Sequence, residues 1–158
     1  MRDKKDKKIM MPISLKECPY YLISRVSLVV TSALKKEFAS SGVEQVKPAY
    51  LGVLMSLWQE DGLKVVELGK KAGLEPSTMT GLLDRMERDE LVARKSDTSD
   101  RRVLRIYLTR TGRQVREPAL KVVERVLNEI FAGIAEDDID QTKHLLRRVL
   151  ANAGSASS

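Results

Sequence analysis

The chain has 158 residues, of which 42% are hydrophobic and only 4% aromatic, so Leu, Val, Ile and Met must supply most of a core, which favours helices over a β-sandwich. The formal net charge of +6 suits an anionic partner. The single cysteine, Cys18, excludes a disulfide within the chain and fits a reducing compartment. No apolar run approaches the ~20 residues that a membrane span needs, and residues 9–11 are too short for a signal segment before Pro12, so we expect a cytoplasmic protein.

The positive charge is concentrated in two segments. Residues 1–8 contain five Lys or Arg and two Asp, and residues 94–113 contain seven Lys or Arg and two Asp. We interpret the first segment as part of a flexible, solubilising tail over residues 1–14. The second lies among elements predicted to be structured, so it is the better candidate for contact with an anionic partner.

Two helices are predicted in the first part of the chain. The first covers residues 15–39, where apolar side chains recur every three or four positions, and it ends at residues 40–42. Its apolar positions are Leu22, Val26, Val29, Val30, Ala33, Leu34 and Phe38. The second begins near Pro48, whose ring suits a first turn, and ends at residues 61–62. Its buried stripe is predicted to consist of Leu51, Leu54, Met55 and Trp58.

A pair of helices joined by a short turn follows. The first is predicted over residues 64–72, and Gly73 is placed to adopt the left-handed conformation that closes a helix. The second opens at Pro76, where the missing N–H costs nothing. Its expected buried stripe is Met79, Leu82, Leu83 and Met86. Two helices joined this closely are typical of a helix-turn-helix.

The hydrophobic period then changes from helical to alternating. Residues 91–95 are predicted to form one strand, residues 96–101 a polar turn and residues 103–108 a second strand. The second strand is expected to direct Leu104, Ile106 and Leu108 to one face and Arg105 and Tyr107 to the other. A β-hairpin directly after a helix-turn-helix is typical of a wing.

Two further helices complete the predicted fold. Thr109 can cap a helix that runs to about Gly133 and is kinked at Pro118, and residues 137–151 form a final helix. The apolar stripes of the first and the last two helices have too few partners within the chain to form a core. Pairing two chains about a twofold axis is the economical way to bury these stripes.

The predicted fold is therefore mainly α with a small wing of two or three strands. We expect a winged helix-turn-helix domain at residues 46–112 and a helical dimerisation region formed by residues 15–45 and 113–152. Short flexible tails are expected at residues 1–14 and 153–158.

The exposed face of the helix that opens at Pro76 carries candidate DNA contacts. Ser77 and Thr78 can hydrogen-bond to phosphates or base edges, and Arg85 can bind a guanine or a phosphate. Gly81 has no side chain to hold the backbone away from DNA. An ordinary solvated helix face would show similar residues.

The turn between the strands carries the second set of candidate contacts. Arg101 and Arg102 lie at the tip of a thin hairpin, which can enter the negatively charged minor groove. Asp100 is expected to pair with an arginine and fix the shape of the loop. The alternative is a charged turn that prevents edge-to-edge pairing of sheets. We favour DNA binding, because the hairpin directly follows the two helices.

Three stretches of the chain resemble the MarR family of winged helix-turn-helix transcriptional regulators. DRRVLRIYLTRTG at residues 100–112 resembles its wing, PSTMTGLLDRME at residues 76–87 its recognition helix, and VKPAYLGVL at residues 46–54 the start of its second helix. The resemblance implies a homodimer whose two winged domains bind a pseudopalindromic operator in double-stranded DNA. Repression is the favoured outcome, and activation is the alternative.

The resemblance also implies roles for individual residues. Arg102 corresponds to the wing-tip arginine, Asp100 to the acid that braces the wing, and Arg94 to a residue near the DNA backbone. The major-groove face would carry Ser77, Thr78, Thr80 and Arg85. The chain departs from the family at Gly81, where some members carry a larger polar or basic residue, and this puts base reading by that position in doubt.

Two mechanisms of regulation are open. Many members of the family release DNA when a small aromatic or phenolic acid binds between the DNA-binding domain and the dimer helices. The residues expected to border that cleft are Tyr20, Tyr21, Arg25, Tyr50 and Trp58, although a core role is favoured for each aromatic residue singly. Some relatives sense peroxides through a cysteine placed like Cys18, but the surrounding sequence does not match theirs, so we favour an inert cysteine.

Other classes of function lack the residues that they need. His144 is the only histidine, so a Cys–His or Ser–His pair has no plausible assembly, and we expect no enzyme, no metal and no cofactor. Residues 62–71 depart from the P-loop pattern in spacing and in the final residue. The better rival is a winged helix that contacts another protein and does not bind DNA. Such a module has no need of cations at the tip of its wing.

Overall fold

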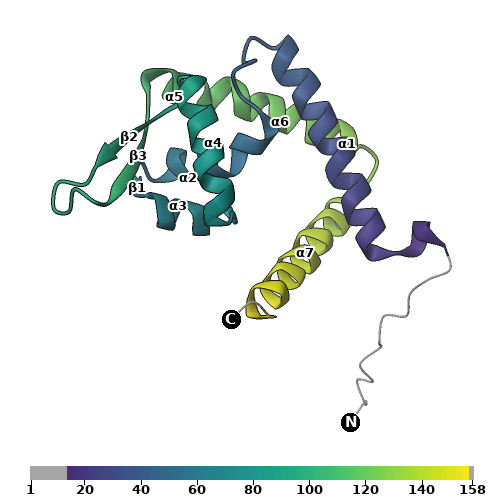
Figure 1. The fold of residues 1–158 in the computed structure, drawn as a ribbon. Helices are drawn as coiled ribbons and strands as arrows, with labels where there is room; N and C mark the ends of the chain where they lie inside the picture. Colours follow the sequence, from purple (N-terminus) through teal and green to yellow (C-terminus); the bar gives the residue numbers. More distant parts are fainter. Residues whose placement is uncertain (1–13, 157–158) are drawn as a thin grey trace.

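The structure is a computed structural model that describes residues 14–156 (Figure 1). The described helices are η1 (Leu15–Glu17), α1 (Pro19–Ser40), η2 (Pro48–Tyr50), α2 (Leu51–Gln59), α3 (Val65–Ala72), α4 (Pro76–Arg88), α5 (Arg110–Gln114), α6 (Arg116–Ile130) and α7 (Glu136–Ala156). The described strands are β1 (Leu63–Lys64), β2 (Val92–Ser96) and β3 (Leu104–Leu108). The predicted fold class, mainly helical with a small β wing, is confirmed.

The sheet contains three antiparallel strands in the order β1-β3-β2. Leu63 pairs with Ile106, and the hairpin register runs from Val92 opposite Leu108 to Ser96 opposite Leu104. The strand β1 consists of the two residues that directly precede α3. The sheet therefore fixes the base of the hairpin on both sides of β3, while the loop between β2 and β3 extends away from the domain (Figure 1).

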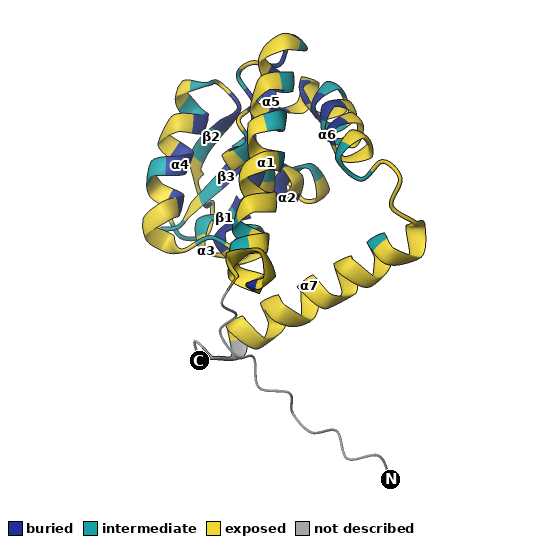
Figure 2. Ribbon diagram, turned by 90° about the vertical axis from the view of Figure 1, so that its right-hand side faces the viewer, coloured by how far each residue is buried: buried dark blue, intermediate teal, exposed yellow. Residues whose placement is uncertain are grey.

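The core of the winged domain lies between α2, α3, α4 and the inner face of the sheet (Figure 2). The predicted stripe of α4 is buried there, and Gly73 closes α3 in the left-handed conformation at φ 67°. Gly112 packs so closely against the residue before β2 that a Cβ atom would lie 2.0 Å from the carbonyl oxygen of Leu91. Thr109 caps α5 by accepting a hydrogen bond from the Gly112 amide at 2.9 Å.

Prolines interrupt two of the predicted helices. The first predicted helix breaks at Cys18, which has extended backbone because the residue before a proline disfavours the helical region, and α1 starts at Pro19. The predicted kink at Pro118 is instead a break at Val115. Pro118 has no N–H for the carbonyl of Gln114, so it falls in the first turn of α6, where no donor is required.

Three further expectations are wrong in detail. Met55 is 45% exposed although it lies at a helical position expected to be buried, and Leu104 is exposed because it lies at the outer end of β3. The final helix continues to Ala156, past the expected end at residue 151. None of the helices described is long and apolar enough to cross a membrane.

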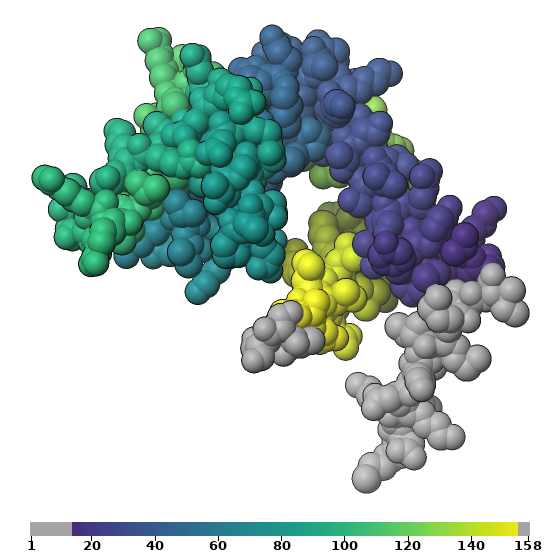
Figure 3. Space-filling view, in the orientation of Figure 1, coloured from purple at the N-terminus to yellow at the C-terminus, as the bar shows by residue number. Residues whose placement is uncertain are grey.

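The terminal helices extend away from the winged domain. The helix α1 packs against α6, where Arg125 bonds Glu37 at 2.6 Å, while α7 leaves the end of α6 and presents an almost fully exposed surface (Figure 2). A hollow separates α7 from the winged domain (Figure 3). The apolar side chains of this region that remain exposed include Leu22, Ile23, Val26, Leu28, Val29, Ile134, Leu145, Leu146, Val149 and Leu150.

Candidate nucleic-acid interface

The helix α4 presents one polar face to solvent. Ser77, Thr78, Thr80 and Arg85 are exposed there, while the apolar stripe on the opposite side is buried in the core. This division follows from the helical period, because residues three and four positions apart share a face. The predicted major-groove residues therefore lie together at an accessible surface, with Ser77 and Thr78 in the first turn.

Gly81 lies beside the side chain of Arg85, one turn further along the same face. A Cβ atom built at Gly81 would lie 3.6 Å from Nη1 of Arg85, so the guanidinium folds back over the glycine. Gly81 is half-buried, and its backbone lies in an ordinary helical conformation. The missing side chain thus leaves room for Arg85.

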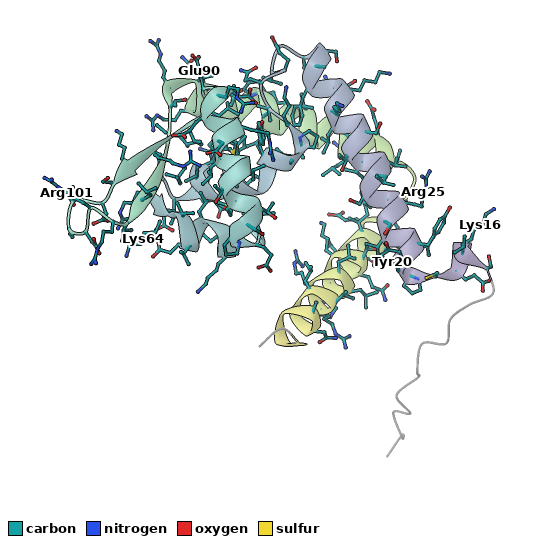
Figure 4. The ribbon with its side chains drawn as sticks, in the orientation of Figure 1. Lys16, Tyr20, Arg25, Lys64, Glu90 and Arg101 are labelled. Atoms are coloured by element: carbon teal, nitrogen blue, oxygen red, sulfur yellow. The ribbon has the colours of Figure 1, made fainter. Side chains whose placement is uncertain are left out.

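The tip of the wing carries two unshielded arginines. Arg101 is exposed at the far end of the hairpin, and the side chain of Arg102 is 91% exposed (Figure 4). Asp100 accepts hydrogen bonds from the backbone amide of Arg102 at 3.0 Å and from its Nε at 3.2 Å. The bond from the Arg102 side chain, followed by that from its amide, lowers the pKa of the Asp100 carboxyl. Asp100 therefore pairs with an arginine in the loop, while Arg102 stays accessible.

Asp97 organises the same loop, and the sequence analysis did not single it out. Its Oδ1 accepts hydrogen bonds from the amides of Ser99 at 2.8 Å and Asp100 at 3.2 Å, and its Oδ2 pairs with Nε of Arg105. The Arg105 bond, followed by the two amides, lowers the pKa of Asp97 to about 2. Arg105 also donates to the carbonyl of Gly62 at 2.8 Å. An Asp in a polar turn is a signal for this arrangement, because its side chain can accept from the backbone amide two residues on.

Arg94, on β2, is directed towards α4. Its Nη2 donates to Oδ1 of Asp84 at 2.7 Å and to the carbonyl of Thr80 at 3.3 Å, and its Nη1 pairs with Oε2 of Glu87. The backbone amide of Arg94 donates to Oε1 of Glu87 at 2.9 Å. The guanidinium of Arg94 thus contacts two carboxylates of α4.

Tyr50 and Trp58, which were expected to border an effector cleft, belong to the winged domain itself. The buried Tyr50 hydroxyl donates to Oδ2 of Asp89 at 2.7 Å, at the end of α4. Burial, with the bond and charge of Asp89, raises the pKa of Tyr50 to about 12, although the charge of Arg85 opposes the shift. Trp58 packs against the core and donates from Nε1 to the carbonyl of Gly112 at 2.9 Å.

The other candidate effector residues lie on α1. Tyr20 is 79% exposed, Tyr21 is half-buried and Arg25 is exposed, at the opposite end of the molecule from the wing tip (Figure 4). One cavity of about 190 Å³ is lined by Arg25 and by apolar side chains of α1 and α6, and none of the four aromatic candidates lines it. A single chain therefore does not assemble the five candidates into one cleft.

Cys18 and His144 have ordinary structural positions. Cys18 is a buried free thiol directly before the first residue of α1, and His144 is exposed on α7. Within the part of the chain that the structure describes, no three His, Cys, Asp or Glu side chains are grouped so that they could hold a metal ion.

Comparison with known proteins identifies relatives of the whole architecture. The model of the MarR family matches residues 48–104. The transcriptional repressor MdtR of Bacillus subtilis (strain 168) is 31% identical over 132 residues, which cover 81% of this chain and 85% of MdtR.

Two solved structures have a similar fold. PcaV, a transcriptional regulator from Streptomyces coelicolor in complex with its natural ligand, is 25% identical with a TM-score of 0.79, over 91% of this chain and 99% of PcaV. The repressor CouR of Rhodococcus jostii RHA1, bound to a 23-mer DNA duplex, is 25% identical with a TM-score of 0.77, over 90% of this chain and 99% of CouR. With a repressor matched along most of both chains, and with an exposed helix beside a cationic wing, this chain belongs to the MarR family of DNA-binding transcriptional regulators and is not an enzyme.

Proposed function

We propose that the protein is a sequence-specific repressor that binds a pseudopalindromic operator as a homodimer. The observation that carries this proposal is the hairpin of unshielded arginines next to an exposed recognition helix. Arg102 makes only loop contacts with Asp100, and the polar face of α4 is open from Ser77 to Arg85. The relatives MdtR and CouR are both named as repressors, which supports repression over activation.

The helix α4 and the wing suit adjacent grooves of one DNA duplex. The first turn of α4 enters the major groove, where Ser77, Thr78 and Thr80 reach base edges or phosphates and Arg85 binds guanine or phosphate. Arg101 and Arg102 follow the neighbouring minor groove, whose negative potential attracts guanidinium groups. Asp97 and Asp100 hold the loop so that the arginines are presented in a fixed arrangement.

The homodimer would form through the terminal helices. Apolar side chains on α1 and α7 are exposed in the single chain, and so many exposed apolar side chains on two helices suit an interaction site. A twofold pair buries the same patch on both chains and presents two recognition helices. We expect half-sites whose centres lie about one helical turn, roughly 10 bp, apart.

A salt titration tests the proposed wing contact. An operator is first selected from a random DNA pool with the unmodified protein. Replacing Arg102 by Ala is then expected to weaken binding and to reduce the slope of log K against log salt by about 1.8, because the homodimer loses two cationic contacts, one from each wing. Arg148→Ala, which removes an exposed arginine of α7, is the control and should leave the slope unchanged. Unaltered affinity of Arg102→Ala at every salt concentration would refute the contact. A protein that binds no duplex at all would favour a protein-interaction module.

Release by a small aromatic or phenolic ligand is the form of regulation that we propose. PcaV, which shares the fold, is described in complex with its natural ligand. The ligand would bind near Arg25, where the cavity beside α1 and α6 has an entirely apolar lining apart from that residue. A screen of aromatic acids for release of the operator tests this, with Arg25→Ala expected to weaken the response.

Oxidation of Cys18 is the alternative mechanism. The thiol is free, but it is buried before α1. If Cys18→Ser abolishes release by organic peroxide and aromatic acids have no effect on the wild-type protein, control by oxidation replaces control by ligand.

A further inference from the structure

We propose that Arg94 is a positioning residue that fixes the wing to the recognition helix, and that it is not a phosphate contact. The inference rests on the proposed function in one respect: α4 and the wing must bind the same duplex. The resemblance to the family placed Arg94 near the DNA backbone, whereas its contacts in the structure are with α4.

The contacts of Arg94 use both its side chain and its backbone. The guanidinium bonds Asp84 at 2.7 Å, Glu87, and the carbonyl of Thr80 at 3.3 Å, while the Arg94 amide bonds Glu87 at 2.9 Å. A planar guanidinium is suited to several acceptors at once, and each bond to an ionised partner restricts its orientation. β2 is therefore joined to three successive turns of α4 through one side chain.

The electrostatics of the cluster also disfavour a phosphate contact. One positive charge faces two carboxylates, so the cluster has an excess of negative charge. The Arg94 side chain is 23% exposed, whereas Arg102 is almost fully exposed and pairs with a single carboxylate. A phosphate could reach Arg94 only by competing with Asp84 and Glu87, both of which repel it.

The position of the cluster explains what it would control. Arg94 lies opposite Ile106 in the middle of the hairpin, so it is anchored to the sheet, and Thr80 lies on the exposed face of α4. Fixing this point sets the orientation of the hairpin relative to the helix before DNA binds. Such preorganisation lowers the cost of placing two elements in adjacent grooves.

Neutral substitutions of Arg94 and of its two carboxylate partners distinguish a positioning residue from a phosphate contact. The two roles predict opposite changes in DNA affinity when a carboxylate is removed. The selected operator and a non-operator duplex are titrated with the full-length variants Arg94→Gln, Glu87→Gln and Asp84→Asn across a range of salt. If Arg94 acts as a clamp that fixes the wing to α4, Arg94→Gln and Glu87→Gln should each weaken operator binding by about 10-fold. The salt slope of each variant should equal that of the wild type. The double variant should be no weaker than the poorer single one, because both remove the same link.

A phosphate contact predicts different results. Arg94→Gln would lower the salt slope by about 1.8, because both chains of the homodimer lose a phosphate contact, and Glu87→Gln and Asp84→Asn would tighten binding to both duplexes because a repulsive charge is lost. Either outcome would contradict the proposal that Arg94 fixes the wing to α4. Arg94→Lys adds a further test: a lysine should replace a phosphate contact, but it cannot restore a clamp that needs a planar fork. Arg102→Gln and Arg148→Gln are the matched controls for a contact and for a distant loss of charge.

Hydrogen exchange of the free protein tests the clamp without DNA. Arg94→Gln and Glu87→Gln should both accelerate amide exchange in residues 92–108, while the midpoint of thermal unfolding shows whether the domain as a whole stays folded. If Arg94→Gln does not fold, Glu87→Gln and Asp84→Asn, which retain Arg94, provide the test. Unchanged exchange in all three variants would refute the clamp. A wild-type protein that fails to distinguish the operator from other DNA would refute the proposed function instead.

Discussion

The winged domain and the terminal helices differ in where their apolar side chains find partners. The stripes of α2, α3 and α4 meet the sheet in one buried cluster, which is joined by Leu34 and Phe38 of α1 and by one face of α6. On the first part of α1 and on α7 a comparable set of side chains stays exposed, and none of the α7 residues whose burial the structure describes is buried. Both regions have the same amphipathic pattern, so the pattern alone does not show whether the partner lies within the chain.

The difference separates two kinds of stability. A domain that completes its own core gains its hydrophobic stabilisation within one chain, whereas helices with an open apolar face gain it only on association. We therefore expect substitutions in the winged domain to change unfolding, and substitutions on α7 to change the oligomeric state. Four experiments test this division, in order of decreasing expected effect.

The largest effect is expected from Leu146→Glu on α7. A carboxylate in a buried apolar interface would be desolvated without a partner, so the proposed dimer should dissociate. Losing the linkage of two half-sites should weaken operator binding by about 10²–10⁴-fold. Sedimentation equilibrium and DNA titration measure the two effects. Gln141→Glu, which adds the same charge to the same helix outside its apolar set, is the control. A dimer that persists in Leu146→Glu would place the interface elsewhere.

Leu54→Ala tests the self-sufficient region. Leu54 is 0% exposed in the core, and truncation there should lower the free energy of unfolding by about 2–5 kcal/mol. The neighbouring Met55 is exposed, so Met55→Ala should change the free energy of unfolding by only about 0.5 kcal/mol. Urea unfolding at one fixed protein concentration gives both values. If Leu54→Ala instead yields a stable monomer, the core and the association are not separate.

Tyr50→Phe removes one hydrogen bond that ties α4 to the start of α2. Asp89 would lose its donor, which should cost about 1–2 kcal/mol in urea unfolding. The pKa of Tyr50 is raised from 10.0 to about 12, so its contribution to stability is complete below pH 10 and is lost as the pH rises through about 12. Tyr50→Phe should flatten the pH dependence in that range. The exposed Tyr20→Phe is the control, and equal effects of both variants would contradict the assignment.

The smallest effect is expected for the loop of the wing. The pKa of Asp97 is lowered from 3.8 to about 2, so its contribution to loop order is present above pH 4 and is lost as the pH falls through about 2. The chemical shift of the Ser99 amide in NMR spectra should change with this titration, and the pH dependence should be absent in Asp97→Asn. A midpoint near pH 4 would show that the bond to Arg105 does not form in solution. At neutral pH we expect Asp97→Asn to weaken operator binding only a few-fold.

Local patterns in the sequence sufficed for much of the winged domain. The stripe of α4, the glycine that closes α3 and the threonine that caps α5 all depend on neighbours within a few residues. Two local signals were misjudged. Pro19 and Pro118 lie in the first turns of helices and not in their interiors, because a proline needs no donor in a first turn. The strand β1 has only two residues, too few for a periodic signal.

The order of the main helices and of the hairpin, the family, and the exposed residues of α4 and the wing tip could all be predicted from the sequence. These follow from local period, turn chemistry and recognisable motifs. The folded structure was needed to show that Tyr50 bonds a carboxylate 39 residues away, that Trp58 bonds a carbonyl 54 residues away, and that Arg94 is held by α4. Partners so distant along the chain are brought together by the packing of the whole domain, and no local pattern of residues encodes that packing.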